Sequence, residues 1–164
     1  MKKSIVILAL AVLSFAFAQN AMAQTATANQ SVSLTVNAVY KISTSGNPGA
    51  LTIDNGTAGT DALTSVSDAT TTYSMTQNSS TPAKITAGLS SGLTAGYSLT
   101  IALASTKGSS AGAVDISSGV AKDVVTAMAK GADAGQGITY VFGANASAGI
   151  LTTTAKTVTL TLTN

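Results

Sequence analysis

The 164-residue chain contains no Cys, His or Trp, and because its eight basic residues are all Lys and its six acidic residues all Asp, it also lacks Arg and Glu. Without His or Cys, the usual nitrogen and sulfur ligands of zinc, copper, haem iron and iron–sulfur clusters are missing. Ser–His–Asp and Cys–His catalytic sites are excluded for the same reason. No Ser stands three residues before a Lys, so no S-x-x-K site is present either. We therefore expect no enzyme activity and no cofactor, and a structural or adhesive role.

The remaining polar features offer little chemistry. Asp61 and Asp68 lie in a Ser- and Thr-rich stretch and could supply oxygen ligands to a hard cation, but no calcium-loop pattern accompanies them. We expect them to be solvated acids of turns. The Gly-rich stretch Gly131–Gly137 matches neither G-x-G-x-x-G nor a phosphate-binding loop, and we predict an ordinary loop there.

The N-terminus has the features of a secretory signal peptide. Lys2 and Lys3 precede an apolar stretch over residues 5–18, which is shorter than the roughly 20 residues of a membrane-spanning helix. Ala21-Met22-Ala23 follows as a small-x-small cleavage pattern, so cleavage after Ala23 would make Gln24 the new terminus. We therefore expect residues 1–23 to be removed and the protein to be secreted.

Removal of residues 1–23 leaves 141 residues with six Lys and six Asp, a formal charge of zero. A neutral surface without Arg indicates no basic patch that would attract the phosphates of nucleic acid, so no nucleic-acid partner is expected. A net charge near zero instead favours association between copies. The absence of Cys also means that no disulfide stabilises the secreted chain.

Apolar residues alternate with Ser and Thr along most of the mature chain, which is the period of half-buried β-strands. Such alternation predicts strands around Leu51 and Ile53, over 71–77, 84–89 and 97–103, near Val114 and Ile116, and around residues 138–142 and 158–162. Short strands separated by Gly-rich turns indicate an all-β, antiparallel β-sandwich. Residues 119–130 are ambiguous: Val120, Val124 and Met128 have helical spacing and favour a short helix, whereas Val124-Val125-Thr126 also suits a strand.

The longest alternation runs from Ser31 to Ile42, with Val32, Leu34, Val36 and Ala38 on one parity. Twelve residues in one phase exceed the usual strand of about 5–6. The run predicts either one long strand of the domain's own sheet or a strand that crosses a subunit boundary. Residues 24–30 before it are polar and rich in Ala and Thr, as a leader to a donated strand would be.

The signal peptide, the run Val32-Ser33-Leu34-Thr35-Val36, the turn Asn47-Pro48-Gly49 before Leu51-Thr52-Ile53, and the closing Thr157–Leu162 together resemble the cysteine-free major pilins of the chaperone–usher class. The resemblance is one of layout over most of the mature chain. It implies an incomplete immunoglobulin-like sandwich that is completed by the N-terminal strand of the next subunit, with Val32, Leu34, Val36 and Ala38 as the assembly residues. Many such pilins carry an aromatic residue near the C-terminus for chaperone recognition, whereas this chain ends in Leu162-Thr163-Asn164.

The expected organisation is a signal peptide over 1–23, a leader and candidate donor strand over 24–36, and a single β-sandwich domain over 37–164. The expected function is a subunit of an extracellular surface fibre that polymerises with copies of itself. The resemblance implies three further partners: a periplasmic chaperone, an outer-membrane assembly machinery, and a host or matrix receptor. The alternative is a monomeric secreted module that binds carbohydrate or matrix through its polar loops.

Overall fold

The computed structural model describes residues 25–164, which fall into two units, residues 25–36 and Asn37–Asn164. The predicted cleavage residues Ala21, Ala23 and Gln24 lie outside the described residues. In the first unit, residues 25–36 form neither helix nor strand. Within the described part of the chain, no helix has the length and apolarity to cross a membrane.

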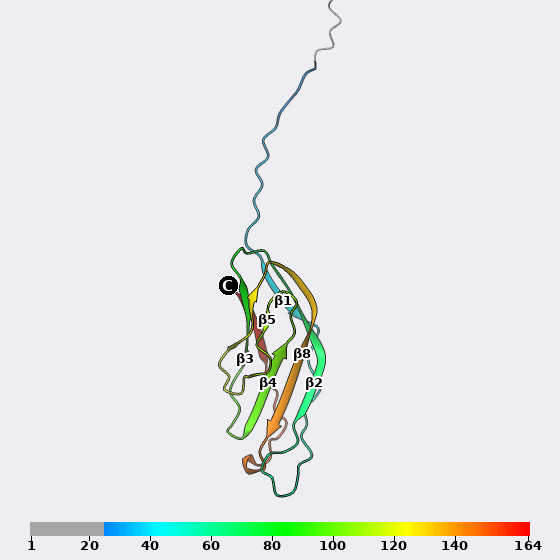
Figure 1. Ribbon diagram of the computed structural model, residues 1–164, viewed down its shortest axis with the longest axis vertical. Helices are drawn as coiled ribbons and strands as arrows, with labels where there is room; N and C mark the ends of the chain where they lie inside the picture. Colours follow the sequence, from blue (N-terminus) through cyan, green and yellow to red (C-terminus); the bar gives the residue numbers. More distant parts are fainter. Residues whose placement is uncertain (1–24) are drawn as a thin grey trace, which may run out of the picture. The chain divides into compact units, whose positions relative to one another are not determined.

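The regular secondary structure of the second unit consists of strands and one 3-10 turn. They are β1 (Tyr40–Thr44), β2 (Val66–Gln77), β3 (Ala83–Leu89), β4 (Tyr97–Leu103), β5 (Ser109–Ser110), β6 (Val114–Asp115), β7 (Lys122–Met128), β8 (Gly131–Ala144) and β9 (Val158–Thr163), with one 3-10 turn, η1 (Ala146–Ala148), before β9. One sheet has the order β1-β2-β8-β4-β6 and the other β5-β7-β3-β9, and all paired neighbours are antiparallel (Figure 1). The predicted all-β antiparallel sandwich is confirmed.

The core lies between the two sheets and follows the predicted alternation. In β4, Ile101 and Leu103 are buried while Ser98, Thr100 and Ala102 between the apolar positions keep some exposure. Tyr73 and Met75 of β2 point to the same core. Each large apolar side chain that leaves water in this way contributes about 1.5–3 kcal/mol, so the core without disulfides depends on this regular alternation.

The predicted helix within residues 119–130 is wrong, because β7 occupies Lys122–Met128. Val124, Val125 and Met128 are all fully buried between β3 and the opposite sheet. Two adjacent buried valines do not fit a regular strand, and the pairing with β3 indeed shifts register twice, on both sides of Ile85. Ala127 takes up part of this irregularity with a φ of 52°, a value that L residues other than Gly seldom adopt. The spacing of Val124 and Met128 did not distinguish the two structures, because residues four apart share a face of a strand as well as of a helix.

The Gly-rich stretch Gly131–Gly137 is also not a loop, because it forms the first half of β8. It pairs with β2 from Gln77 to Thr72, with one register shift between Tyr73 and Met75. Gly131 and Gly135 have positive φ values of 126° and 64°, and the glycines therefore let the strand follow the irregular ladder. Pairing with β2 decides the structure here, and composition does not.

Two predicted strands are shorter or missing. Of the alternation from Ser31 to Ile42, only the end belongs to β1, which starts at Tyr40, so the prediction of one long strand within the domain's own sheet is wrong. Leu51 and Ile53 are not in a strand, because no neighbouring strand pairs with them in the described chain. The strands expected around residues 71–77, 84–89, 97–103, 114–116, 138–142 and 158–162 are present, and β6 lies at a sheet edge.

Candidate binding groove

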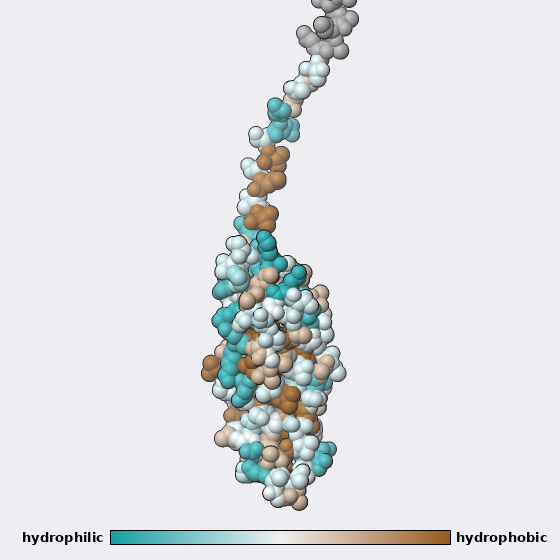
Figure 2. All heavy atoms as spheres, viewed as in Figure 1, coloured by the Kyte–Doolittle hydropathy of each residue, from teal (hydrophilic) through white to brown (hydrophobic). Residues whose placement is uncertain are grey.

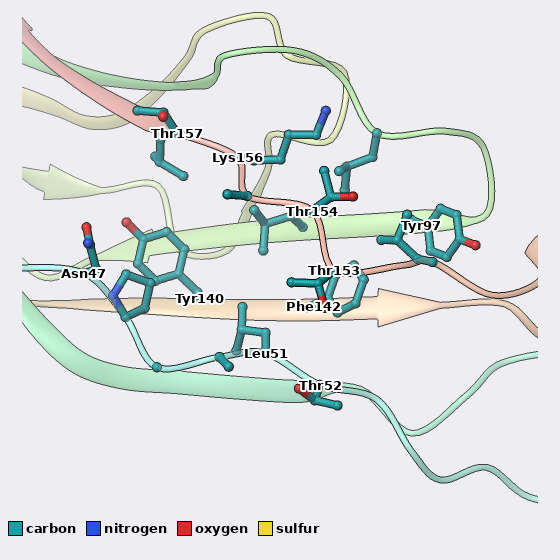
Figure 3. A pocket seen from close by; sticks show the side chains of 18 of the residues that line it. Asn47, Leu51, Thr52, Tyr97, Tyr140, Phe142, Thr153, Thr154, Lys156 and Thr157 are labelled. Atoms are coloured by element: carbon teal, nitrogen blue, oxygen red, sulfur yellow. The ribbon is translucent and has the colours of Figure 1, made fainter.

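A groove opens in the second unit between two segments that follow β1 and precede β9. We call residues 46–53 the first wall and residues 150–156 the second wall. Both walls line a concavity of about 1320 Å³. Figure 3 shows the first wall with Leu51 and the second wall with Thr153 passing on either side of Tyr140 and Phe142. The volume exceeds the roughly 300–1,000 Å³ of small-molecule pockets, which suits an extended peptide better.

The backbone of both walls is largely unpaired. Within residues 25–164, no backbone–backbone hydrogen bond involves residues 46–53 or 150–156. The ladders stop at both walls: Ser45 N–H donates to the Thr72 carbonyl at 2.9 Å, and Ser90 N–H donates to the Thr157 carbonyl at 2.8 Å. Because unpaired backbone groups in a concave surface seek hydrogen-bond partners, each wall offers donors and acceptors to an added strand.

The floor of the groove comes from β4 and β8. Tyr97 and Phe142 stack with ring centroids 6.5 Å apart and an interplanar angle of 14°. The Tyr97 hydroxyl donates to the Ala148 carbonyl at 3.1 Å, which ties this aromatic pair to the turn before the second wall. Burial, and next the negative charge of Asp68, raise the pKa of the Tyr140 hydroxyl above its usual value. The floor is therefore apolar and aromatic, with one phenol in a poorly hydrated position.

Side chains from the sandwich hold the walls in place. The Asp68 carboxylate accepts from Gly49 N–H at 3.2 Å, which ties the first wall to β2. The same carboxylate accepts from the Thr70 backbone and hydroxyl, and these hydrogen bonds lower the pKa of Asp68. On the second wall, Lys156 donates to the Ser91 hydroxyl at 2.6 Å. A few contacts at fixed points thus position segments whose main chain is otherwise unpaired.

Charge is nearly absent from the groove. Lys156 is the one charged residue among the described residues that line it. The remaining lining consists of aliphatic, aromatic, Ser, Thr, Gly, Ala, Asn and Pro residues. Apart from Lys156, the lining offers no charged partner that would offset the lost hydration of a charged ligand, so it favours an uncharged and partly apolar occupant.

The predicted assembly residues are exposed. Val32, Leu34 and Val36 lie in the first unit and have 75%, 88% and 86% of their surface accessible. Figure 2 shows apolar side chains, in brown, along the segment that precedes the second unit. Ala38 is exposed as well, at the start of the second unit. The groove belongs wholly to the second unit.

The resemblance implies an open sandwich, but the residues that line the groove were not predicted from the sequence. Leu51 and Ile53 were noticed as apolar alternation but were assigned to a strand. Tyr140 and Phe142 were expected in a strand without any role. The signal that could have located a wall is the stretch Thr152–Thr157. It is rich in Thr, which favours extended backbone, yet it lacks the apolar alternation of a paired strand.

The two acids considered for a cation serve other contacts. Asp61 accepts from Ser147 N–H at 2.8 Å and from the Ser147 hydroxyl at 2.9 Å, and Asp68 lies in β2 rather than in a turn. The described residues contain no cluster of three or more Asp, Glu, His or Cys side chains placed to hold a metal ion.

No protein-family model, curated protein or solved structure matches this chain.

Proposed function

We propose that the chain is the structural subunit of an extracellular fibre, in which the N-terminal segment of one copy fills the groove of the next. The observation that carries the proposal is the groove whose two walls have unpaired main chains. An added strand there would form ladders with both walls and bridge β1 of one sheet to β9 of the other. The sandwich would then be an incomplete one of immunoglobulin-like type.

The exposed segment complements the groove in charge and in pattern. Residues 24–38 contain no charged side chain, as an occupant of a groove with one Lys requires. Val32, Leu34 and Val36 alternate with Ser and Thr, so an extended chain presents all three to one side. Burial of these three side chains would contribute about 1.5–3 kcal/mol each before the cost of ordering the segment.

The length of the segment suits the walls. The first wall has eight residues and the second has seven, and the alternating run Val32–Val36 of the first unit has five. At about 3.3 Å per residue, this run extends over some 15–17 Å, so one segment could pair with most of each wall.

The proposal includes the route to the cell surface. The predicted signal peptide directs the chain to the periplasm, where a chaperone would cover the open groove until an outer-membrane assembly machinery replaces it with a subunit. A host or matrix receptor would meet the finished fibre. These partners come from the resemblance to chaperone–usher pilins, and the exposed apolar groove is the feature that a chaperone would need to protect.

The test is a denaturing gel of purified material with and without boiling. We expect a ladder of multimers that collapses to the monomer only on heating, because paired main chains dissociate slowly. Deletion of residues 24–36 should abolish the ladder while the domain 37–164 stays folded by circular dichroism. A single monomer band in both lanes, or a ladder that survives the deletion, would refute the proposal; the monomer band would favour the monomeric binding module instead.

A further inference from the structure

The start of the domain carries an unusual side-chain contact at Asn78. This residue follows Gln77, the last residue of β2, which pairs with Tyr40 at the start of β1. The Asn78 side-chain oxygen accepts from Val39 N–H at 2.7 Å, and its side-chain nitrogen donates to the Asn37 carbonyl at 2.9 Å. Asn78 N–H also donates to the Val39 carbonyl at 3.3 Å. One exposed asparagine therefore holds three backbone groups of residues 37–39.

These contacts continue the ladder beyond its last regular pair. In an antiparallel pair, Val39 N–H would donate to the backbone carbonyl of the residue opposite, which is residue 78. Here the side-chain oxygen of Asn78 takes the place of that carbonyl. The second side-chain bond reaches one step further, to Asn37. The main chain of residues 37–39 thus follows the course of β1 without being part of it.

The path of residues 37–39 determines which groove residues 32–36, called the assembly segment below, can enter. Ile42, Ser43 and Thr44 of β1 line the groove of the same molecule. For residues 32–36 to fold back into that groove, the chain would have to reverse within residues 37–39 and break both side-chain bonds of Asn78. Tight reversals favour Gly or a positive φ, and residues 31–41 contain no Gly and none of them has a positive φ.

We propose that Asn78 is a positioning residue that keeps the assembly segment out of its own groove and so directs it to a second copy. The inference rests on the proposed function, because it specifies which molecule supplies the strand. Each side-chain hydrogen bond of this kind shifts an equilibrium by about twofold or more. Loss of both bonds should therefore raise self-insertion about fivefold or more.

The test uses the absence of Cys from the chain, which allows two labels at chosen places. Gln30→Cys in the segment and Thr153→Cys in the second wall, both exposed positions, receive a fluorescent donor and acceptor. Doubly labelled subunits are diluted into a large excess of unlabelled subunits with the same residue at position 78, so energy transfer reports only a segment in its own groove. The transfer is measured with Asn78, with Asn78→Ala and with Asn78→Asp.

We expect the high-transfer fraction to rise about fivefold or more in Asn78→Ala. Asn78→Asp should give an intermediate rise, because it keeps the acceptor for Val39 N–H and loses the donor to the Asn37 carbonyl. The matched control is Asn55→Ala, which removes an exposed side-chain bond to Gly56 N–H far from this contact and should leave the transfer unchanged.

The outcomes separate the two proposals. If the unlabelled wild-type protein forms the heat-sensitive ladder but Asn78→Ala transfers no more than Asn55→Ala, the role of Asn78 is refuted and strand donation stands. If the wild type forms no such ladder and the deletion of residues 24–36 changes nothing, the proposed function fails, and the role of Asn78 falls with it.

Discussion

The alternation of the assembly segment predicts that one face of it carries the binding energy. Leu34 is 88% exposed and stands in the middle of the run, whereas its neighbour Thr35 points to the opposite side of an extended chain. We compare Leu34→Ala with Thr35→Ala. If Leu34 becomes buried in a groove, truncation to Ala removes about 2–3 kcal/mol from each junction, because Leu→Ala changes in packed sites cost about 2–5 kcal/mol.

A loss of about 2–3 kcal/mol corresponds to a roughly 30- to 150-fold increase in the dissociation constant of a junction. Polymers of each variant are incubated at rising temperature and run unboiled, and the temperature of half-dissociation is recorded. Leu34→Ala should fall apart well below the wild type, and Thr35→Ala close to it. Equal effects of the two changes would refute the one-sided insertion that the parity predicts.

Two further predictions concern buried polar groups. Asp133 is 2% exposed and accepts from the hydroxyls of Ser105 and Thr106 at 2.8 and 2.7 Å. Asp133→Asn should therefore lower the free energy of unfolding at pH 7 by about 2–4 kcal/mol. The control is Asp123→Asn, at an exposed ion pair, which should cost under about 1 kcal/mol. Burial tends to raise the pKa of Asp133, but hydrogen bonds from Thr106, Ser105 and two backbone amides outweigh it, so the pKa lies below its ordinary value. This stabilisation is therefore complete above about pH 4 and is lost as pH falls through the lowered pKa. Denaturant unfolding from pH 7 to 2 should show a steeper decline in the free energy of unfolding for the wild type than for Asp133→Asn. Parallel curves for the two proteins would contradict the role given to Asp133. Covering the groove should raise the pKa of Tyr140 further, which absorbance titration of polymer and monomer checks with Tyr140→Phe as reference, and an unchanged Tyr140 pKa would speak against a covered floor.

The strands that the sequence predicted well are those whose pattern is local and regular. β4 coincides with the alternation over 97–103, because Ile101 and Leu103 lie in the core and Leu99 packs against it, while Ser98 is exposed. The structure of β7 was predicted wrongly because Val124 and Met128, four residues apart, would share a face of a helix as well as of a strand. The burial of the adjacent Val125 goes with the two register shifts against β3. Irregular ladders depend on the partner strand, and the partner is not visible in a local pattern.

The first half of β8 shows that composition, like a local pattern, does not predict a strand whose partner is distant in the sequence. Gly and Ala over residues 131–137 have low strand preference, yet β2 supplies a long complementary edge and the segment pairs with it. Asp133 adds a second reason, since its carboxylate collects donors from the loop after β4 and so fixes this end of the strand. Neither contact could be foreseen from residues 131–137 alone.

The two halves of the proposed junction differ in how much the sequence reveals of them. The assembly segment is visible as a pattern because the function proposed for it depends on consecutive residues: Val32, Leu34 and Val36 need only an extended chain to share a side. The groove depends on residues 46–53, on the floor from β4 and β8, and on residues 150–156, which meet only when the sandwich has formed. The walls are defined by the absence of backbone hydrogen bonds to a neighbouring strand. That absence produces no periodic pattern of apolar residues in the sequence. For a chain of this kind, an apolar alternation that no strand of its own sheet uses is therefore the more informative sign, because it implies a groove that the fold must provide somewhere else.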